Sequence, residues 1–222
     1  MKKEFVIIGI FALILIGVGF VCATGIKIAQ GEYQMNVKIH EGWNIIEGFH
    51  PNFLLPDSEI TSGDITAVFM YAPDLNKYIE VYPTNKISES GINQNDEYYD
   101  DEAGAYSYWV YSKKDGNLKY QPHIIEPNNI AMKTGWNFLG INPEMKGKSL
   151  NELKGTCTYE KVNYFEASQQ AWSPNYALNS RDKDEKMTDD ALGLGVLIKV
   201  PSDCILSVSG SNSNLNPPQI PN

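Results

Sequence analysis

Histidine and cysteine are scarce in this sequence, and the spacings from which metal and nucleophile sites are built are missing. The histidines, His40, His50 and His123, each lack a second histidine or a cysteine at metal-ligand spacing. Serine never occurs as Gly-x-Ser-x-Gly, the turn that holds a hydrolase nucleophile. The Gly193–Gly195 segment lacks the third glycine of a dinucleotide-binding loop, because Ile198 stands in that place. These absences predict a protein that is not an enzyme and carries no cofactor.

Positive charge is also scarce. Lys and Arg number 18 against 27 Asp and Glu, which gives a formal net charge of −9 at pH 7. No run of basic residues interleaved with aromatic residues occurs. An acidic surface repels the phosphates of nucleic acids and of anionic lipid headgroups. We therefore expect no nucleic-acid partner, and contact with a membrane only through the N-terminal segment.

The N-terminal segment has the pattern of an export signal. Two lysines precede an almost uninterrupted apolar run from Phe5 to Ala23, and small residues before Thr24 suit cleavage there. The run is also long enough to cross a hydrocarbon core of about 30 Å. Residues 1–23 are therefore predicted to be either a signal peptide or an N-terminal membrane anchor. Because basic residues stay inside, the remainder is expected outside the cytoplasm, secreted or anchored at the cell surface.

A tripeptide recurs along the chain, and a series of landmark residues recurs after each copy at nearly the same distances. Gly42-Trp43-Asn44 returns as Gly135-Trp136-Asn137. The later matches are Pro51 with Pro143, Asp57 with Ser149, Gly63 with Gly155, Tyr71 with Phe165, and Tyr78 with Trp172. This repetition predicts two tandem copies of one module, over residues 35–121 and 128–208. Residues 209–222 are Ser, Asn and Pro with little to bury, which predicts a disordered tail.

The local patterns in both copies favour strands. Met35, Val37 and Ile39 alternate with polar residues, which is the period of a half-buried strand. Runs rich in β-branched and aromatic residues predict further strands at 43–49, 68–72, 78–82 and 105–112, and at 130–132, 136–141, 162–166, 171–172, 196–200 and 204–208. Ser149 to Glu152 has the capping-box pattern of a helix start, and Gly155 suits its end. Asp57 and Gly63 have the same spacing.

These patterns together predict a mainly β fold: two tandem copies of a small β-sandwich or barrel-like module, each with one short helical turn, after an N-terminal hydrophobic helix. Trp43 and Trp136 each follow glycine and precede asparagine. That combination suits a turn with the ring packed in the core and the amide closing the loop.

The Gly-Trp-Asn motif, with its apolar pair, proline, capped turn and aromatic strand, resembles the Gly-Trp-Asn repeat modules of secreted and surface proteins of bacteria and archaea. The resemblance covers about residues 35–208. It implies a β-rich surface module, often in tandem and generally without an assigned activity, and it supplies no catalytic residues. The first copy departs from the second by lacking cysteines and by having Glu47 where the second has Gly140.

Two groups of residues are candidates for ligand binding. Tyr106, Tyr108 and Trp109 lie on one expected strand, with Tyr106 and Tyr108 on one face and Trp109 pointing the other way. They form either an exposed face for sugar rings or a protein, or a cross-strand ladder of the core. The acidic loops are either weak candidates for calcium binding or simply solvated loops. If two of their carboxylates lay in one cleft, a secreted hydrolase would become a candidate function. The calcium candidates are Asp96, Asp100, Asp101, Asp182 and Asp184.

The number of cysteines outside the N-terminal segment is even, which predicts a disulfide. If the leader is cleaved before Thr24, Cys22 leaves with it, and if it is retained, Cys22 stays in the membrane. Cys157 and Cys204 then remain as a pair in an oxidising compartment, where such pairs are usually bridged.

The function that these patterns favour is a non-catalytic secreted or surface protein with a structural, adhesive or interaction role. Its expected partners are other components of the cell envelope, protein or polysaccharide. A carbohydrate-binding module that uses the aromatic residues of the first copy is the alternative, and a secreted hydrolase is the third candidate.

Overall fold

A computed structural model describes residues 34–93, 106–122, 129–173 and 184–207. The predictions for residues 1–23 and 209–222 lie outside the described residues. Residues 34–222 belong to one compact unit. No helix in the described ranges is both long and apolar enough to span a membrane.

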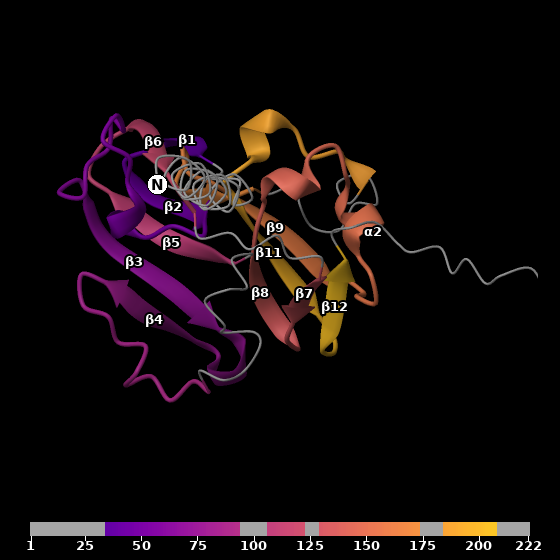
Figure 1. Cartoon of the computed structure of the whole chain (residues 1–222). Coiled ribbons are helices and arrows are strands. Elements are labelled where there is room, and N and C mark those ends of the chain that lie inside the picture. The colour runs from indigo at the N-terminus through magenta and orange to yellow at the C-terminus, as the bar shows by residue number, and fades with distance from the viewer. Residues whose placement is uncertain (1–33, 94–105, 123–128, 174–183, 208–222) are drawn as a thin grey trace, which may run out of the picture. The chain divides into compact units, whose positions relative to one another are not determined.

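The described chain is mainly β, as the sequence predicts, and its strands are antiparallel. Figure 1 shows the strands in chain order. The first six strands are β1 (Met35–Ile39), β2 (Gly42–Glu47), β3 (Ile65–Ala72), β4 (Lys77–Tyr82), β5 (Ser107–Ser112) and β6 (Gly116–Tyr120). The remaining six are β7 (Asn129–Met132), β8 (Gly135–Gly140), β9 (Lys161–Glu166), β10 (Ala171–Trp172), β11 (Gly195–Val200) and β12 (Cys204–Ser207).

Short helices connect some of these strands. The 3₁₀ turns are η1 (Pro51–Phe53), η2 (Pro73–Leu75), η5 (Pro143–Met145) and η6 (Asp189–Ala191), and one α-helical turn, α2, spans Leu150–Leu153. Ser149 begins α2 with the predicted capping box, in which its side chain accepts from the Glu152 amide and the Glu152 side chain accepts from the Ser149 amide. Gly155 has a left-handed φ of 52° after the helix, as its position suggested.

The strand order is the same in the two four-stranded sheets. The first sheet, in the order β2-β5-β3-β4, and the second, in the order β8-β11-β9-β10, each place the Gly-Trp-Asn strand at one edge. A two-stranded sheet accompanies each, β1 with β6 and β7 with β12. We call residues 35–120 the first half and residues 129–207 the second half.

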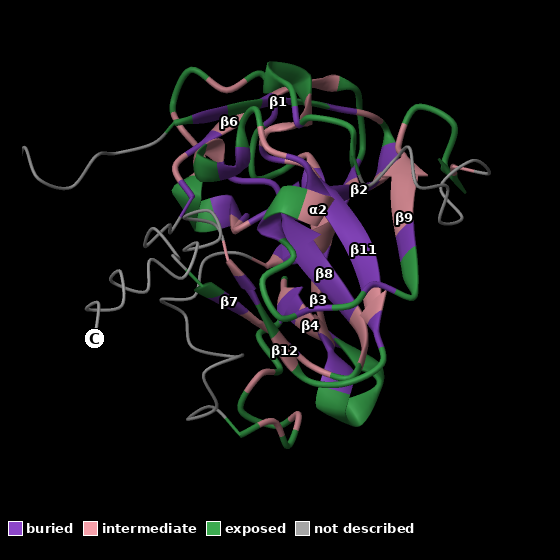
Figure 2. Ribbon diagram, turned by 90° about the vertical axis from the view of Figure 1, so that its right-hand side faces the viewer, coloured by how far each residue is buried: buried purple, intermediate pink, exposed green. Residues whose placement is uncertain are grey.

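Each half buries its own hydrophobic core. In the first half, strand β1 has alternating burial, so Met35, Val37 and Ile39 face inward, where they join residues such as Val110 and Tyr120. The second half packs residues of β8 and β11 against α2 and the strands β7 and β12. Figure 2 shows this concentration of buried residues on β8 and β11.

The Gly-Trp-Asn turns have nearly identical geometry. Gly42 and Gly135 have left-handed φ angles of 97° and 99°, which residues other than glycine rarely adopt. The buried amide of Asn44 accepts from the His40 amide at 2.9 Å and donates to the carbonyls of His40 and Gly42 at 2.8 and 3.1 Å. Asn137 makes the same three bonds, to Lys133 and Gly135, at the same distances. The amides therefore close the loops as expected.

Two details differ from the sequence-based expectation. The stretch Asp57–Gly63 forms turns and no helix, and Gly63 has no left-handed φ. Its backbone is bonded to strand β6 instead, since the amides of Leu55 and Glu59 donate to the carbonyls of Lys119 and Asn117. Strand β6 itself was not expected, although Leu118 and Tyr120 alternate with polar residues there.

The two four-stranded sheets join through their edges. Isolated bridges pair Ile46 with Leu194 and Tyr106 with Leu139, so the edge strand of each sheet meets the chain that enters the inner strand of the other. Gly195 lies at this junction, where a Cβ atom would come within 2.2 Å of Ile45 and 2.3 Å of Ser107. A third cluster of buried residues, Ile45, Phe138 and Leu197, fills the space between the sheets.

Candidate binding pocket

An aromatic pocket of about 490 Å³ lies between the two four-stranded sheets. Six aromatic side chains and one amide line it: Trp43, Phe69, Tyr78 and Trp109 from the first half, and Phe165, Gln170 and Trp172 from the second. The volume is within the range of small-ligand clefts. Both halves are needed to build it.

Trp109 is at the centre of this group of rings. Its ring centroid is 4.8 Å from that of Phe165, 5.7 Å from Trp172 and 5.9 Å from Trp43, in edge-to-face arrangements. Such packing is favourable because the positive edge of one ring meets the negative face of another. The rings therefore support each other's positions across the two sheets.

The β pleat decides which rings reach the pocket. On β5, Val110 points into the first core, and its neighbours Trp109 and Tyr111 point to the opposite face, toward the second sheet. Tyr78 and Trp172 are the outer members of paired rows, Tyr71 beside Tyr78 and Phe165 beside Trp172. Their exposed fractions are 52% and 42%, so large apolar rings stand open at the rim.

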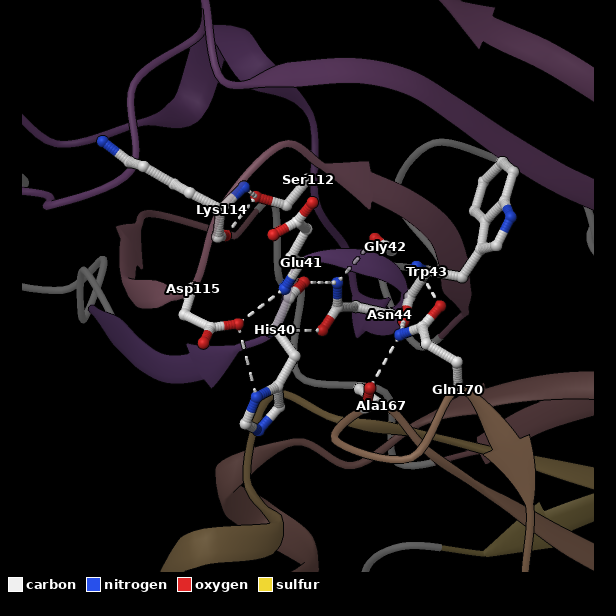
Figure 3. A network of polar contacts seen from close by, with 10 residues as sticks. All are labelled: His40, Glu41, Gly42, Trp43, Asn44, Ser112, Lys114, Asp115, Ala167 and Gln170. Atoms are coloured by element: carbon white, nitrogen blue, oxygen red, sulfur yellow. Dashed lines mark hydrogen bonds and ion pairs between the residues drawn. The ribbon is translucent and has the colours of Figure 1, made fainter.

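Gln170 attaches the second half to the edge of the first sheet. It has a left-handed φ of 50° in the turn between β9 and β10. Its Oε1 accepts from the Trp43 amide at 2.7 Å, and its Nε2 donates to the carbonyls of Trp43 and Ala167 at 2.9 and 2.6 Å. Figure 3 shows the carboxamide along the Trp43 backbone, with the Trp43 ring pointing away from it. The side chain thus pairs with an edge strand as a neighbouring backbone would.

Among the residues that the structure describes, the pocket lining carries no carboxylate, imidazole, thiol or amine. Its hydrogen-bonding side chains are three indoles, the Tyr78 hydroxyl and the Gln170 amide, whose donors are already engaged. No described residue accepts a bond from the indole N–H of Trp43, Trp109 or Trp172. The described lining is mainly aromatic, and such rings are suited to stacking against a ligand.

The structure separates the three aromatic residues that the sequence grouped. Trp109 lines the pocket. Tyr108 packs against the core of the first half, while Tyr106 packs against the core of the second and donates from its hydroxyl to the Ala131 carbonyl at 2.9 Å. The three rings therefore do not share one face.

The two tryptophans of the repeated motif are half-buried and lie outside the cores of the two halves. Trp43 lines the pocket, and Trp136 packs against the cluster between the sheets. The expectation of core packing was wrong in this respect, because residue 43 or 136 alternates with the inward-facing asparagine that closes its turn.

The acidic candidates do not form a metal site in the described residues. Asp96, Asp100, Asp101 and Asp182 lie outside them. Asp184 accepts from Asn151 Nδ2 at 2.7 Å. No group of three or more His, Cys, Asp or Glu side chains suited to a metal occurs within the described ranges.

Glu47 is a fully buried carboxyl group in the first half. Neither of its side-chain oxygens has a hydrogen-bond partner among the described residues, and its backbone carbonyl accepts from the Tyr120 hydroxyl at 2.6 Å. Desolvation raises the pKa of Glu47 from 4.5 to about 8. Burial, and secondarily the charge of Glu47, raises the pKa of Tyr120 well above its usual value. The Glu47 side chain is therefore neutral at pH 7.

The predicted disulfide is present in the second half. Cys157 and Cys204 are bonded, with their Cα atoms 5.0 Å apart. The bridge connects the segment after α2 to the start of β12, beside the bonds between Thr156 and Ile205. It therefore reinforces contacts that the backbone already makes.

Of the described pocket residues, sequence reasoning named only Trp109 as a ligand-binding candidate and missed the other six: Trp43, Phe69, Tyr78, Phe165, Gln170 and Trp172. The matched positions of Tyr71 with Phe165 and Tyr78 with Trp172 were the available signal. The pocket needs a further fact that spacing does not give, namely that these rows of the two sheets face each other. No protein-family model, curated protein or solved structure matches this chain.

Proposed function

We propose that this chain is a non-catalytic, extracytoplasmic interaction protein built from two tandem copies of a Gly-Trp-Asn type module, and that the aromatic pocket between its sheets is the binding site. The observation that carries the proposal is the pocket itself, which combines exposed rings with a lining that is mainly aromatic in the described part of the chain. Exposed aromatic groups of this kind mark ligand or protein contacts.

Three observations support the tandem copies. The two four-stranded sheets have the same strand order. The Gly-Trp-Asn turns share their φ angles and amide bonds. The bridges Ile46 to Leu194 and Tyr106 to Leu139 are equivalent, because Ile46 corresponds to Leu139 and Leu194 corresponds to Tyr106. The extracytoplasmic location rests on the N-terminal sequence and agrees with a bonded cysteine pair.

Retention of native envelope components by the immobilised full chain tests the proposal. Trp43→Ala and Trp172→Ala each remove a pocket ring, and Trp136→Ala removes the corresponding ring that does not line the pocket. We expect the first two variants to lose retention and Trp136→Ala to keep it. Equal retention by all four proteins, each shown to be folded by circular dichroism, would exclude the pocket as the binding site.

A neutral sugar is a second candidate ligand, favoured by the presence of Trp109 in the pocket beside two other indoles. Aromatic faces bind the apolar faces of sugar rings. The corresponding test is titration of the full chain with neutral oligosaccharides, followed by tryptophan fluorescence. A saturable change that Trp172→Ala abolishes would support it.

A further inference from the structure

The hydrogen-bonding character of the pocket narrows its ligand class. The three indoles supply donors only, and the Gln170 carboxamide already uses both Nε2 hydrogens in bonds to Trp43 and Ala167. The described lining residues therefore offer more free donors than acceptors. Sugar hydroxyls donate as well as accept, whereas a proline-rich peptide presents mainly carbonyl acceptors because proline has no N–H.

The mode of peptide binding is also restricted. At the Trp43 end, the edge of the first sheet is occupied by Gln170. A strand cannot add at that position, so a peptide would have to be held through its side chains. Stacking of proline rings on aromatic residues is the established way for such grooves to hold extended segments.

The chain itself contains a segment with the matching chemistry. Residues 208–222, which lie outside the described residues, have no charged side chain, and they include Pro217, Pro218 and Pro221. Pro218 and Pro221 stand in the P-x-x-P spacing that favours the polyproline II conformation and its recognition by aromatic grooves. An uncharged segment loses no charge solvation on entering an uncharged pocket, although the chain as a whole carries a net charge of −9.

We propose that the aromatic pocket binds the Pro217–Pro221 segment of this same protein. This inference rests on the proposed function, because it names the partner of the same pocket. The pyrrolidine rings stack on Trp43, Trp109 and Trp172, and the indole N–H groups donate to carbonyls of the segment. Pro217 follows Ser207 by ten positions, which is a reach of at most about 35 Å.

The test uses the full chain with Pro217, Pro218 and Pro221 all changed to Ala, which leaves the pocket free of its own segment. A synthetic peptide of residues 215–222 is titrated in, and tryptophan fluorescence is followed. We expect saturable binding that a peptide with the three prolines replaced by Ala does not show. Adding Trp172→Ala should weaken binding at least tenfold, and adding Trp136→Ala should leave it within twofold.

The intact chain then identifies the source of the segment. A sedimentation coefficient that rises with concentration, and is lowered by the triple proline variant, indicates a segment supplied by a second copy. A constant value, together with slower peptide binding than in the triple variant, indicates the same chain. Both results support the proposal.

Two results would overturn it. The first is the absence of saturable peptide binding. If Trp172→Ala nevertheless abolishes retention of envelope components, the pocket keeps its proposed function and binds a different ligand. Peptide binding that Trp172→Ala and Trp43→Ala both leave unchanged places the segment elsewhere. The failure of this inference is thus distinguishable from the failure of the proposed function.

Discussion

The two halves of the molecule have the same strand order and differ most where they face each other. By strand register, Trp109 corresponds to Leu197 and Phe69 to Asn163, so at these two positions only the first half has an aromatic ring. Glu47 corresponds to Gly140, and Asn76 corresponds to Gln170. The second half alone has a disulfide in the described residues. The two halves therefore keep the same arrangement of strands while the side chains on their facing surfaces differ.

The turn between β3 and β4, and the corresponding turn between β9 and β10, illustrate this. Asn76 and Gln170 both have left-handed φ angles, of 47° and 50°. The Tyr71 hydroxyl donates to the Asn76 side chain at 2.6 Å, while Phe165, at the position of Tyr71, has no hydroxyl. Gln170 is longer and is not held in this way, and it reaches the Trp43 backbone. The hydroxyl of Tyr71 and the additional methylene of Gln170 are therefore the differences that give a local contact in the first half and a contact between the halves in the second.

Replacing Glu47 should have the largest effect. Its pKa is raised in the folded state, so stability that is present below about pH 4.5 is lost as the pH rises toward 8. The shift from 4.5 to about 8 corresponds to a loss of about 5 kcal/mol. Glu47→Gln should remove this dependence and unfold at higher denaturant concentration than the unchanged chain at pH 8.

The measurement is the difference in unfolding free energy between variant and unchanged chain from pH 5 to pH 8.5. Glu185→Gln, at an exposed position, is the control and should give a flat difference. A flat difference for Glu47→Gln would show that the carboxyl is hydrated in solution.

Removing the disulfide should have the next largest effect and should act on the second half. The bridge closes a loop of 47 residues, for which the chain-entropy account gives about 4 kcal/mol. Cys157→Ser and Cys204→Ser should lower the unfolding free energy equally, and reductant should lower that of the unchanged chain by a similar amount. Two titratable thiols in the protein isolated without reductant would contradict the bridge.

The two motif asparagines offer a direct comparison between the halves. Asn44→Ala and Asn137→Ala each remove three hydrogen bonds from a buried turn. Each should cost about 2 kcal/mol, because backbone groups lose their partners. Chemical denaturation of both variants measures this. Costs that differ by more than about 1 kcal/mol would mean that the turns are equivalent in geometry and unequal in energy.

Gln170→Ala should have the smallest effect, about 1 kcal/mol, since the side chain is exposed. The local consequence is sharper: the Trp43 amide loses its acceptor and should exchange its hydrogen faster. Asn76→Ala, at the corresponding turn, should leave exchange at Trp43 unchanged. Equal exchange rates in both variants would show that the Gln170 contact is not populated in solution.

Much of the fold could be predicted from local patterns in the sequence. Alternating residues such as Met35, Val37 and Ile39 predict strands because the pleat has a period of two. The capping box at Ser149 and the cysteine pair were likewise predicted, because both depend on residue type and on local or compartment chemistry.

The pocket could not be predicted in the same way. It depends on contacts such as that between Gln170 and Trp43, which are 127 residues apart. Asp57 shows the opposite error: it stands at a cap-like spacing, but its carboxylate pairs with Lys119 Nζ at 2.6 Å. Spacing gives the local options, and the packing of distant segments decides among them.

The reciprocal bridges between the halves have a consequence for assembly. Ile46 pairs with Leu194, and the corresponding residue Leu139 pairs with Tyr106. Each half therefore contacts the other through the same two positions. A surface that is complementary to its own copy forms a closed two-fold interface. Either half produced alone would keep both surfaces unpaired, and two such chains could associate through the contacts that one chain now makes internally. Because both halves belong to one chain, this association is intramolecular and independent of protein concentration.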